Sequence, residues 1–279
     1  MVNFNVSGNN LNPKQPEFVL ATSSYTKKIL MNNDIAHFYQ FTAESNHMGV
    51  IPDACIDILF IKKDGKIKTR IAGTRFIKGE TCTEQNGEYF GVRFMPGYNP
   101  VSKKIKLSEL VDHEENFEDV VTFGDEKERL LENMYVATSF EEKINIFMNY
   151  YKHTRNREED KNSLKYVLRN KLLKSNGDIK LTELSTLTGY SLRYLNKKVH
   201  EDFGMNPKSL IRFIRFQKSI NDMIKTLNHI HCIDTALDSG YYDQSHFNKE
   251  FKQLSGLTPT HYIENLLLHS YDKKLHILD

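Results

Sequence analysis

The sequence is poor in the features that mark secreted and membrane proteins. It has no tryptophan, and its three cysteines, Cys55, Cys82 and Cys232, are far apart and lack C-x-x-C spacing. Such isolated thiols are typical of proteins in a reducing compartment. No apolar run approaches the roughly 18 residues of a membrane span. The polar first residues, MVNFNVSGNNLNPKQP, lack the apolar stretch of a secretory signal. We therefore expect a cytoplasmic protein with no membrane association.

Charge is nearly balanced over the whole chain but not along it. The formal net charge is +2. Residues 161–279 contain 18 Lys and Arg against 12 Asp and Glu, whereas residues 1–160 contain 20 against 24. A basic C-terminal part joined to an acidic N-terminal part is compatible with nucleic-acid binding at one end. A basic region of this size is also common on an ordinary solvated surface, so the charge alone decides nothing.

The N-terminal part is expected to form β-strands. Two turn signals, Asp64-Gly65 and Asn86-Gly87, divide residues 50–97 into strand-like runs that read as hairpins. In the run CIDILFIK, both faces of the expected strand carry apolar side chains. Ile56, Ile58 and Phe60 lie on one face, and Cys55, Leu59 and Ile61 lie on the other. Because both faces are apolar, we predict that the strand is covered on both sides, as in a small barrel or sandwich.

From about residue 105 the apolar spacing becomes that of helices. Ser139, followed by Glu141 and Glu142, has the pattern of a helix N-cap, and the charged run TRNREEDKN at 154–162 marks a linker. A lone helix could not leave its apolar cluster exposed: Leu130, Leu131, Met134 and Val136. Packing on the strand domain and pairing of two chains would cover this cluster equally well, and we favour a homodimer.

An internal repeat dominates the C-terminal part. LSTLTGYSLRYL at 184–195 parallels TALDSGYYDQSHF at 235–247, with one extra residue in the second turn. Beyond the turn, LNKKVHEDFGMNP at 195–207 parallels FNKEFKQLSGLTP at 247–259, with apolar, glycine and proline positions in register. Agreement at so many special positions indicates two copies of one structural unit.

Each copy has the pattern helix, glycine turn, helix. Thr182 and Ser191 are the expected caps of the first copy, and Gly189 is its turn. In the second copy, Ala236 is the small residue at the helix contact, and the turn and cap are Gly240 and Asp243. This is the helix-turn-helix plan, in which the second helix enters a major groove.

The second helix of each copy offers hydrogen-bonding side chains near its N-terminal end, where base edges would lie. We predict that these side chains read bases: Arg193, Asn196 and Lys197 in the first copy, and Gln244, Ser245, His246 and Lys249 in the second. The long helix predicted between the copies, at 207–227, has a basic side that could meet phosphates or only face water. The candidate phosphate contacts are Ser191, Arg212, Arg215 and Asp243.

With these motifs, residues 165–266 resemble the AraC/XylS family of bacterial transcription regulators. The most specific element is GYYDQSHFNKEFKQLSGLTPTHY, supported by LSTLTGYSLRYLNKKV and the linking IRFQKS. The resemblance implies two helix-turn-helix units that enter successive major grooves on one side of the DNA, with reading helices at Ser191–Val199 and Gln244–Phe251, and it implies RNA polymerase as a partner. Most members activate transcription. The chain departs from the family pattern at four positions that are not on these helices: Cys232, Thr235, Tyr241 and Ile263.

The N-terminal segments PDACIDILF and GVRFMPG are loosely similar to uncharacterised effector domains of such regulators. This similarity implies a cupin-like β-barrel followed by helices that pair subunits, and hence an α+β protein. The expected domains are a sensor at 1–110, a helical connector at 111–160 and a DNA-binding domain at 161–279.

A metal-dependent cupin enzyme is the competing interpretation of the N-terminal part. It would need clustered His and carboxylate ligands, yet residues 48–112 contain no histidine. The H-x-H at 229–231 lies in the DNA-binding part and is interpreted as a solvated loop. We therefore expect no enzyme activity, metal or cofactor.

Two charged residues, Asp57 and Arg93, stand inside otherwise apolar strands, where an unpaired charge is costly. They pair with each other or with neighbours, face water, or line an effector pocket in which Arg93 could meet an anion. The sequence as a whole predicts a DNA-binding regulator, an activator that responds to a small molecule. The alternative is an architectural DNA-binding protein whose barrel only oligomerises.

Overall fold

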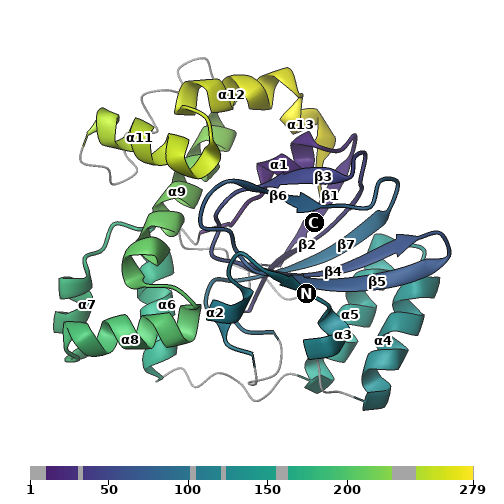
Figure 1. Cartoon of the computed structure of the whole chain (residues 1–279), viewed down its shortest axis with the longest axis horizontal. Coiled ribbons are helices and arrows are strands. Elements are labelled where there is room, and N and C mark those ends of the chain that lie inside the picture. The colour runs from purple at the N-terminus through teal and green to yellow at the C-terminus, as the bar shows by residue number, and fades with distance from the viewer. Residues whose placement is uncertain are drawn as a thin grey trace, which may run out of the picture.

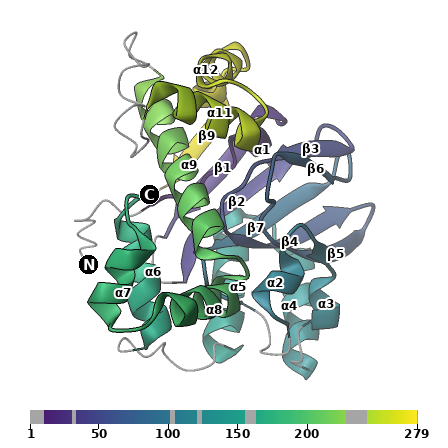
Figure 2. The same cartoon turned by 60° about the vertical axis from the view of Figure 1, so that its left-hand side comes forward.

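The structure is a computed structural model that describes residues 11–30, 34–100, 105–120, 124–154, 163–227 and 243–278. A β-sheet with its own helices lies beside a group of helices from the C-terminal part (Figures 1 and 2). This arrangement confirms the α+β class. In the ranges given, no helix is long and apolar enough to cross a membrane.

Seven strands form one sheet in the order β8-β5-β4-β7-β2-β1-β9. Their bounds are Tyr25–Ile29 (β1), Ile35–Thr42 (β2), Ile56–Lys63 (β4), Lys66–Ala72 (β5), Glu88–Phe94 (β7), Glu114–Glu115 (β8) and Leu275–Leu278 (β9). A second, two-stranded sheet pairs His47–Val50 (β3) with Gly79–Cys82 (β6). The predicted barrel is not closed, because the strand pairing found in the described residues leaves β8 and β9 as edges, so this part is an open sheet with a small second sheet.

The two predicted turns are present, but only one closes a hairpin. Asp64 and Gly65 have φ of 48° and 72°, the left-handed pair that a two-residue hairpin loop requires, and they join β4 to β5. Asn86 also has a positive φ, of 64°. However, β6 pairs with β3, whereas β7 pairs with β2 and β4. The second hairpin prediction is therefore wrong, because the Asn86-Gly87 turn leads from one sheet to the other.

Both faces of β4 are covered, as its apolar pattern predicts. Ile58 and Phe60 lie in the cluster beneath the helices α3 (Phe117–Val120), α4 (Gly124–Val136) and α5 (Phe140–Thr154), where Phe60 meets Phe147 edge-on at 6.2 Å. Ile61 points to the opposite face, into a cluster shared with α1 (Pro16–Leu20). Burial on both faces explains why this run has no polar alternation.

The connector helices pack onto the sheet. Leu130 and Met134 are buried there, whereas Val136 at the end of α4 is 65% exposed. The Ser139 cap is confirmed, since its hydroxyl accepts from the backbone N–H of Glu142 at 3.2 Å. Most of the linker predicted at 154–162 lies outside the described residues. The sheet thus covers most of the apolar cluster without a second chain.

The C-terminal part is helical up to its last strand. The helices are α6 (Leu164–Lys174), α7 (Leu181–Thr188), α8 (Leu192–Phe203), α9 (Pro207–Thr226), α11 (Gln244–Ser255), α12 (Pro259–Leu268) and α13 (Tyr271–Lys274). The first helix and turn predicted for the second copy, with Ala236, Gly240 and the H-x-H motif, lie outside the described residues.

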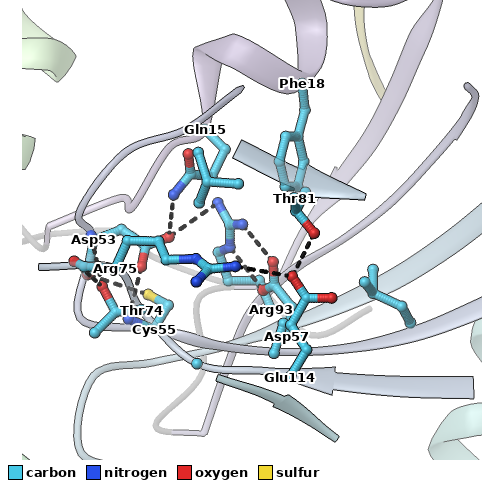
Figure 3. Close-up of a pocket in the computed structure, with 14 residues that line it drawn as sticks. Gln15, Phe18, Asp53, Cys55, Asp57, Thr74, Arg75, Thr81, Arg93 and Glu114 are labelled. Carbon is cyan, nitrogen blue, oxygen red and sulfur yellow. Dashed lines mark hydrogen bonds and ion pairs between the residues drawn. The ribbon is translucent and has the colours of Figure 1, made fainter. Parts of the chain in front are cut away.

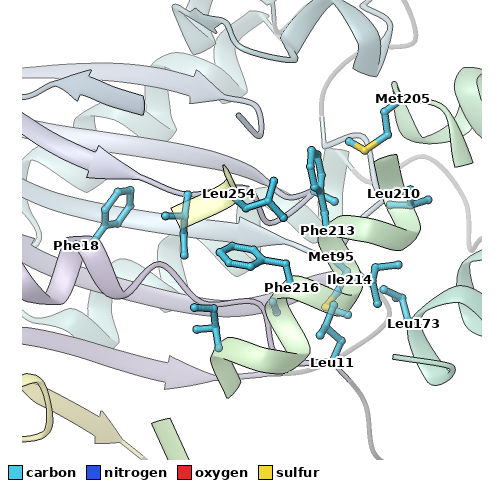
Figure 4. Close-up of a cluster of buried hydrophobic side chains, with 14 of the residues drawn as sticks. Leu11, Phe18, Met95, Leu173, Met205, Leu210, Phe213, Ile214, Phe216 and Leu254 are labelled. Atoms are coloured by element: carbon cyan, nitrogen blue, oxygen red, sulfur yellow. The ribbon is translucent and has the colours of Figure 1, made fainter. Parts of the chain in front are cut away.

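A shared apolar core joins the helical part to the sheet domain (Figure 4). Phe213 of α9 meets the ring of Phe76 edge-on at 5.5 Å. Gly204, which ends α8 with φ of 74°, lies against Leu107 of α2 (Leu107–Leu110), where a Cβ would come within 2.6 Å of the Leu107 carbonyl carbon. Only glycine satisfies both requirements, since other residues rarely adopt this φ and their side chains would collide.

The last strand of the chain lies in the N-terminal sheet. β9 pairs in parallel with β1, in register from Tyr25↔Leu275 to Lys28↔Leu278. The Nζ of Lys274 donates to the carbonyl of Leu20 at 3.0 Å. The end of the C-terminal part is therefore fixed to the sheet domain by main-chain pairing, a feature that the sequence did not indicate.

Candidate nucleic-acid interface

The first helix-turn-helix unit is formed by α7 and α8. Gly189 turns the chain between them with φ of 73°, as predicted. The Ser191 hydroxyl caps α8 by accepting from the backbone N–H of Tyr194 at 3.3 Å. The prediction of Thr182 as a cap is wrong, because the N-cap is Lys180, two residues earlier, and it makes no side-chain cap hydrogen bond.

The second unit contributes α11, which matches α8 closely. Asp243 caps it by accepting from the N–H of His246 at 2.7 Å, and Gly256 ends it in the left-handed region with φ of 78°. Both helices contain 12 residues. Phe247 and Phe251 of α11 are buried, as are Leu195 and Val199 at the corresponding positions of α8. Where the structure describes both copies, the repeat is therefore a structural repeat.

Both reading helices present their predicted side chains to solvent. All seven are exposed: Arg193, Asn196, Lys197, Gln244, Ser245, His246 and Lys249. Asn196 also donates its amide to the carbonyl of Leu192 at 2.9 Å, and Lys197 lies 3.8 Å from Glu201. These intrahelical contacts are weak at exposed sites and leave the groups available to a partner.

The reading helix α8 comes directly before α9, whereas α11 packs against the first half and middle of α9, through Arg212 with Glu250 and Phe216 with Phe251. In Figure 1 both reading helices lie on the side away from the sheet. With its 20 residues, α9 is roughly 30 Å long. One continuous helix therefore joins the two helix-turn-helix units.

The candidate phosphate contacts are already used within the protein. Arg212 lies 3.2 Å from the carboxylate of Glu250 and donates to Gln253, so it ties α9 to α11. Arg215 donates to the carbonyl of Gly177 at 3.4 Å. The side chains of Ser191 and Asp243 cap the reading helices. Ser191, Asp243 and Arg212 thus help to position the reading helices, whereas Arg215 holds the segment between α6 and α7.

A second polar cluster lies inside the sheet domain (Figure 3). Arg93 of β7 faces Asp57 of β4 and donates from Nε and Nη2 to its two carboxylate oxygens, at 2.8 and 2.5 Å. Its Nη1 lies 3.5 Å from Asp53. The Tyr39 hydroxyl completes the cluster by donating to Asp57 at 2.8 Å. Of the alternatives open for Asp57 and Arg93, mutual pairing is correct, and both residues also line a cavity.

Two carboxylates thus share one guanidinium. Burial alone would lower the pKa of Arg93, but Asp57 and Asp53 raise it well above its usual range, so the guanidinium stays charged. Burial raises the pKa of Asp53, and the attraction of Arg93 only partly offsets this. The offset is only partial because Asp57 holds the bidentate contact with the guanidinium, so Asp53 is the surplus negative charge of the cluster.

The cavity beside this cluster measures about 40 Å³. Its charged lining residues are Asp53, Asp57, Arg75, Arg93 and Glu114, and apolar side chains, among them Phe18, Val50 and Leu59, line the rest together with smaller polar groups. This volume suits one or two water molecules, whereas small-molecule sites usually measure about 300–1,000 Å³. A larger ligand would therefore require the cavity to open.

A chain of hydrogen bonds links this cavity to α9. The amide of Gln15 donates to Asp53 at 2.9 Å and to the carbonyl of Ile51. The preceding residue, Lys14, donates its backbone N–H to the side-chain oxygen of Gln217 on α9 at 2.8 Å, and its carbonyl accepts from the Gln217 side-chain nitrogen at 3.1 Å. Sequence reasoning missed Gln15, Asp53 and Gln217. The only available signal was a second carboxylate four residues before Asp57.

Two family models match separate parts of the chain. Residues 184–265 match the family described as "Helix-turn-helix domain", and residues 29–116 match a domain family of unknown function, DUF6597. No curated protein matches the chain. A structure of ToxT from Vibrio cholerae is 14% identical with a TM-score of 0.42, and covers 87% of this chain and 98% of its own. Wild-type ToxT with a bound unsaturated fatty acid is also 14% identical, with a TM-score of 0.39 and coverage of 87% and 93%.

Proposed function

The chain belongs to the AraC/XylS family of helix-turn-helix transcription regulators, and from this premise we propose that it is a one-component activator whose sheet domain senses a signal. In this proposal α8 and α11 enter successive major grooves on one face of the DNA. The seven exposed side chains at their N-terminal halves read base edges. The sheet domain and α9 transmit the state of the sensor.

The observation that carries the DNA-binding proposal is the pair of matched helices, α8 and α11, that α9 joins. Each has a capped N-terminus, a buried apolar face and an exposed polar face. A helix seated in the major groove needs this combination, because the buried face fixes its angle while the exposed face meets the bases.

The DNA-binding proposal is tested by selecting duplexes from a random library with the full-length protein and measuring their affinity at several salt concentrations. We expect a preferred sequence and an affinity that falls linearly on a log–log plot against salt, as phosphate contacts require. A protein that enriches no sequence would refute base reading.

For the sensor, we propose that an effector acts by opening the cavity beside Arg93. Any change in the position of Asp53 would pull on Gln15 and through it on Lys14, which holds Gln217. The charges around the cavity favour a neutral or cationic effector, since Arg93 is already paired with two carboxylates. An anion would have to displace them.

The effector proposal is tested by thermal shift of the full-length protein with a panel of small amines, alcohols and carboxylates. We expect stabilisation by members of the first two classes, and loss of that stabilisation in Asp53→Asn. Equal shifts in both proteins would remove Asp53 from the site.

One observation favours the architectural alternative, in which the sheet domain takes no effector. The cavity of about 40 Å³ is too small for most metabolites as it stands. If no small molecule shifts either the unfolding temperature or the DNA affinity, this second function is the better account.

The proposal includes RNA polymerase and a second copy of the chain as partners. A groove of about 400 Å³ between α4 and α5 and the exposed Val136 support pairing through the connector. Analytical ultracentrifugation distinguishes a dimer from a monomer. In vitro transcription with purified RNA polymerase, on a promoter that carries the selected site, distinguishes activation from repression.

A further inference from the structure

The turn of the first helix-turn-helix unit carries an exposed apolar patch. Within eight residues, four large apolar side chains are 43–55% exposed: Leu187, Tyr190, Leu192 and Tyr194. The rings of Tyr190 and Tyr194 stack with their centroids 4.8 Å apart. Single exposed apolar residues are normal, but a cluster of this kind marks an interaction surface.

The patch is continuous with the proposed reading face. Leu192 is the first residue of α8 and Tyr194 the third, on either side of the base-reading candidate Arg193. The stack with Tyr190 limits the freedom of the Tyr194 ring, so the ring is ordered before any partner binds. Leu192 and Tyr194 therefore flank Arg193 at the N-terminal end of α8, the end at which a recognition helix contacts base edges.

The second unit offers different chemistry at the corresponding positions. Counting from the N-caps, Leu192 corresponds to Gln244 and Tyr194 to His246. The two reading helices thus share their geometry but differ in polarity at their first and third residues. Two identical half-sites would not satisfy both.

The base edges of the major groove contain one apolar group, the 5-methyl of thymine. We infer that the first unit reads thymine methyl groups through Leu192 and Tyr194, while the second unit reads its half-site by hydrogen bonds; this inference rests on the proposed DNA-binding function. The operator is then an asymmetric pair of half-sites, with thymine opposite the start of α8. The neighbouring cations Arg193 and Lys197 match the charge of the DNA at this surface.

The experiment replaces thymine by deoxyuridine, one position at a time, in a duplex selected by the full-length protein. This removes the methyl group and leaves base pairing unchanged. At one or more thymines of the half-site contacted by α8 we expect the dissociation constant to rise about four-fold, from one buried methyl group. Substitution in the other half-site should change it less than two-fold.

Variants of the patch assign the effect to its residues. In Leu192→Ala and Tyr194→Ala the ratio of the dissociation constants for uracil and thymine at the sensitive positions should fall from about four to about one. The matched control, Gln244→Ala at the position equivalent to Leu192, should keep the four-fold ratio in the first half-site. Unfolding curves of each variant report whether the fold is intact. The ratio compares two duplexes with the same variant, so a general loss of DNA affinity does not change it.

Three results would overturn the inference. They are a first half-site without thymine, an unchanged ratio in both patch variants, and patch variants that bind DNA normally but lose activation with RNA polymerase, which would make the patch a protein contact. A failure of the proposed function looks different, because no specific duplex would then be selected at all.

Discussion

Replacing Gln217 with leucine removes the polar end of a fully buried side chain on α9 and keeps most of its volume. The Gln217 amide nitrogen donates to the carbonyls of Lys14 and Pro52, at 3.1 and 2.8 Å, and its oxygen accepts from the backbone N–H of Lys14 at 2.8 Å. The substitution therefore leaves three main-chain groups of the sheet domain without these partners.

Each of these hydrogen bonds contributes about 0.5–1.5 kcal/mol, so the loss amounts to about 2–4 kcal/mol. The backbone N–H of Lys14 reports it directly, because in the wild type this hydrogen bonds to Gln217. If opening of this contact controls exchange, Gln217→Leu should exchange the Lys14 amide hydrogen about 30- to 700-fold faster, which is the same free energy expressed as a ratio.

The assays are urea unfolding and amide hydrogen exchange of the full-length protein. The matched control is Gln253→Leu, which removes the same amide from an exposed position on α11 where it bonds only Arg212 among the described contacts. The control should cost less than about 0.5 kcal/mol. If Gln217→Leu behaves like the control in both assays, the hydrogen bonds between the sheet domain and α9 do not hold these parts together.

Three further predictions concern single side chains. Arg193→Ala and Gln244→Ala should each lose about 1–3 kcal/mol of affinity for the selected DNA and none for random DNA, and a uniform loss would make them phosphate contacts instead. Burial, with a smaller effect of Lys225, lowers the pKa of Lys14 from 10.5 to about 8, so between these pH values the unfolded chain binds more protons than the folded chain. The stability of the wild type should therefore rise over this pH window by about 1–3 kcal/mol more than that of Lys14→Met. Parallel pH profiles of the two proteins in urea unfolding would contradict the buried charge. Arg93→Met leaves two buried carboxylates without their cation and should cost about 3–5 kcal/mol in the same assay, whereas a neutral result would mean that the carboxylates are protonated or solvated.

The features that the sequence predicted depend on local chemistry. The caps Ser191 and Asp243, the turn glycine Gly189 and the two apolar faces of β4 follow from periodicity and from residues with strong positional preferences. The repeat made these signals firmer, because each copy supports the other. The hairpin expected at Asn86-Gly87 failed since a turn residue does not determine which strand the next one pairs with.

The features that the sequence did not predict depend on contacts between distant residues. Gln217 is 203 positions from Lys14, and β9 pairs with a strand 250 residues earlier in the chain. Neither a buried glutamine nor the short run LHIL carries a local signal of its partner. Asp53 was missed for the same reason, since only the fold brings Arg93 and Gln15 to its two sides.

The spacing of the two reading helices is tested most directly by mapping guanine N7 protection and hydroxyl-radical cleavage on the selected duplex with the full-length protein. We predict two protected major-groove tracts on one face of the DNA, with centres about 10–10.5 base pairs apart. A single protected tract, or two tracts on opposite faces, would contradict the proposal that α8 and α11 bind successive grooves together.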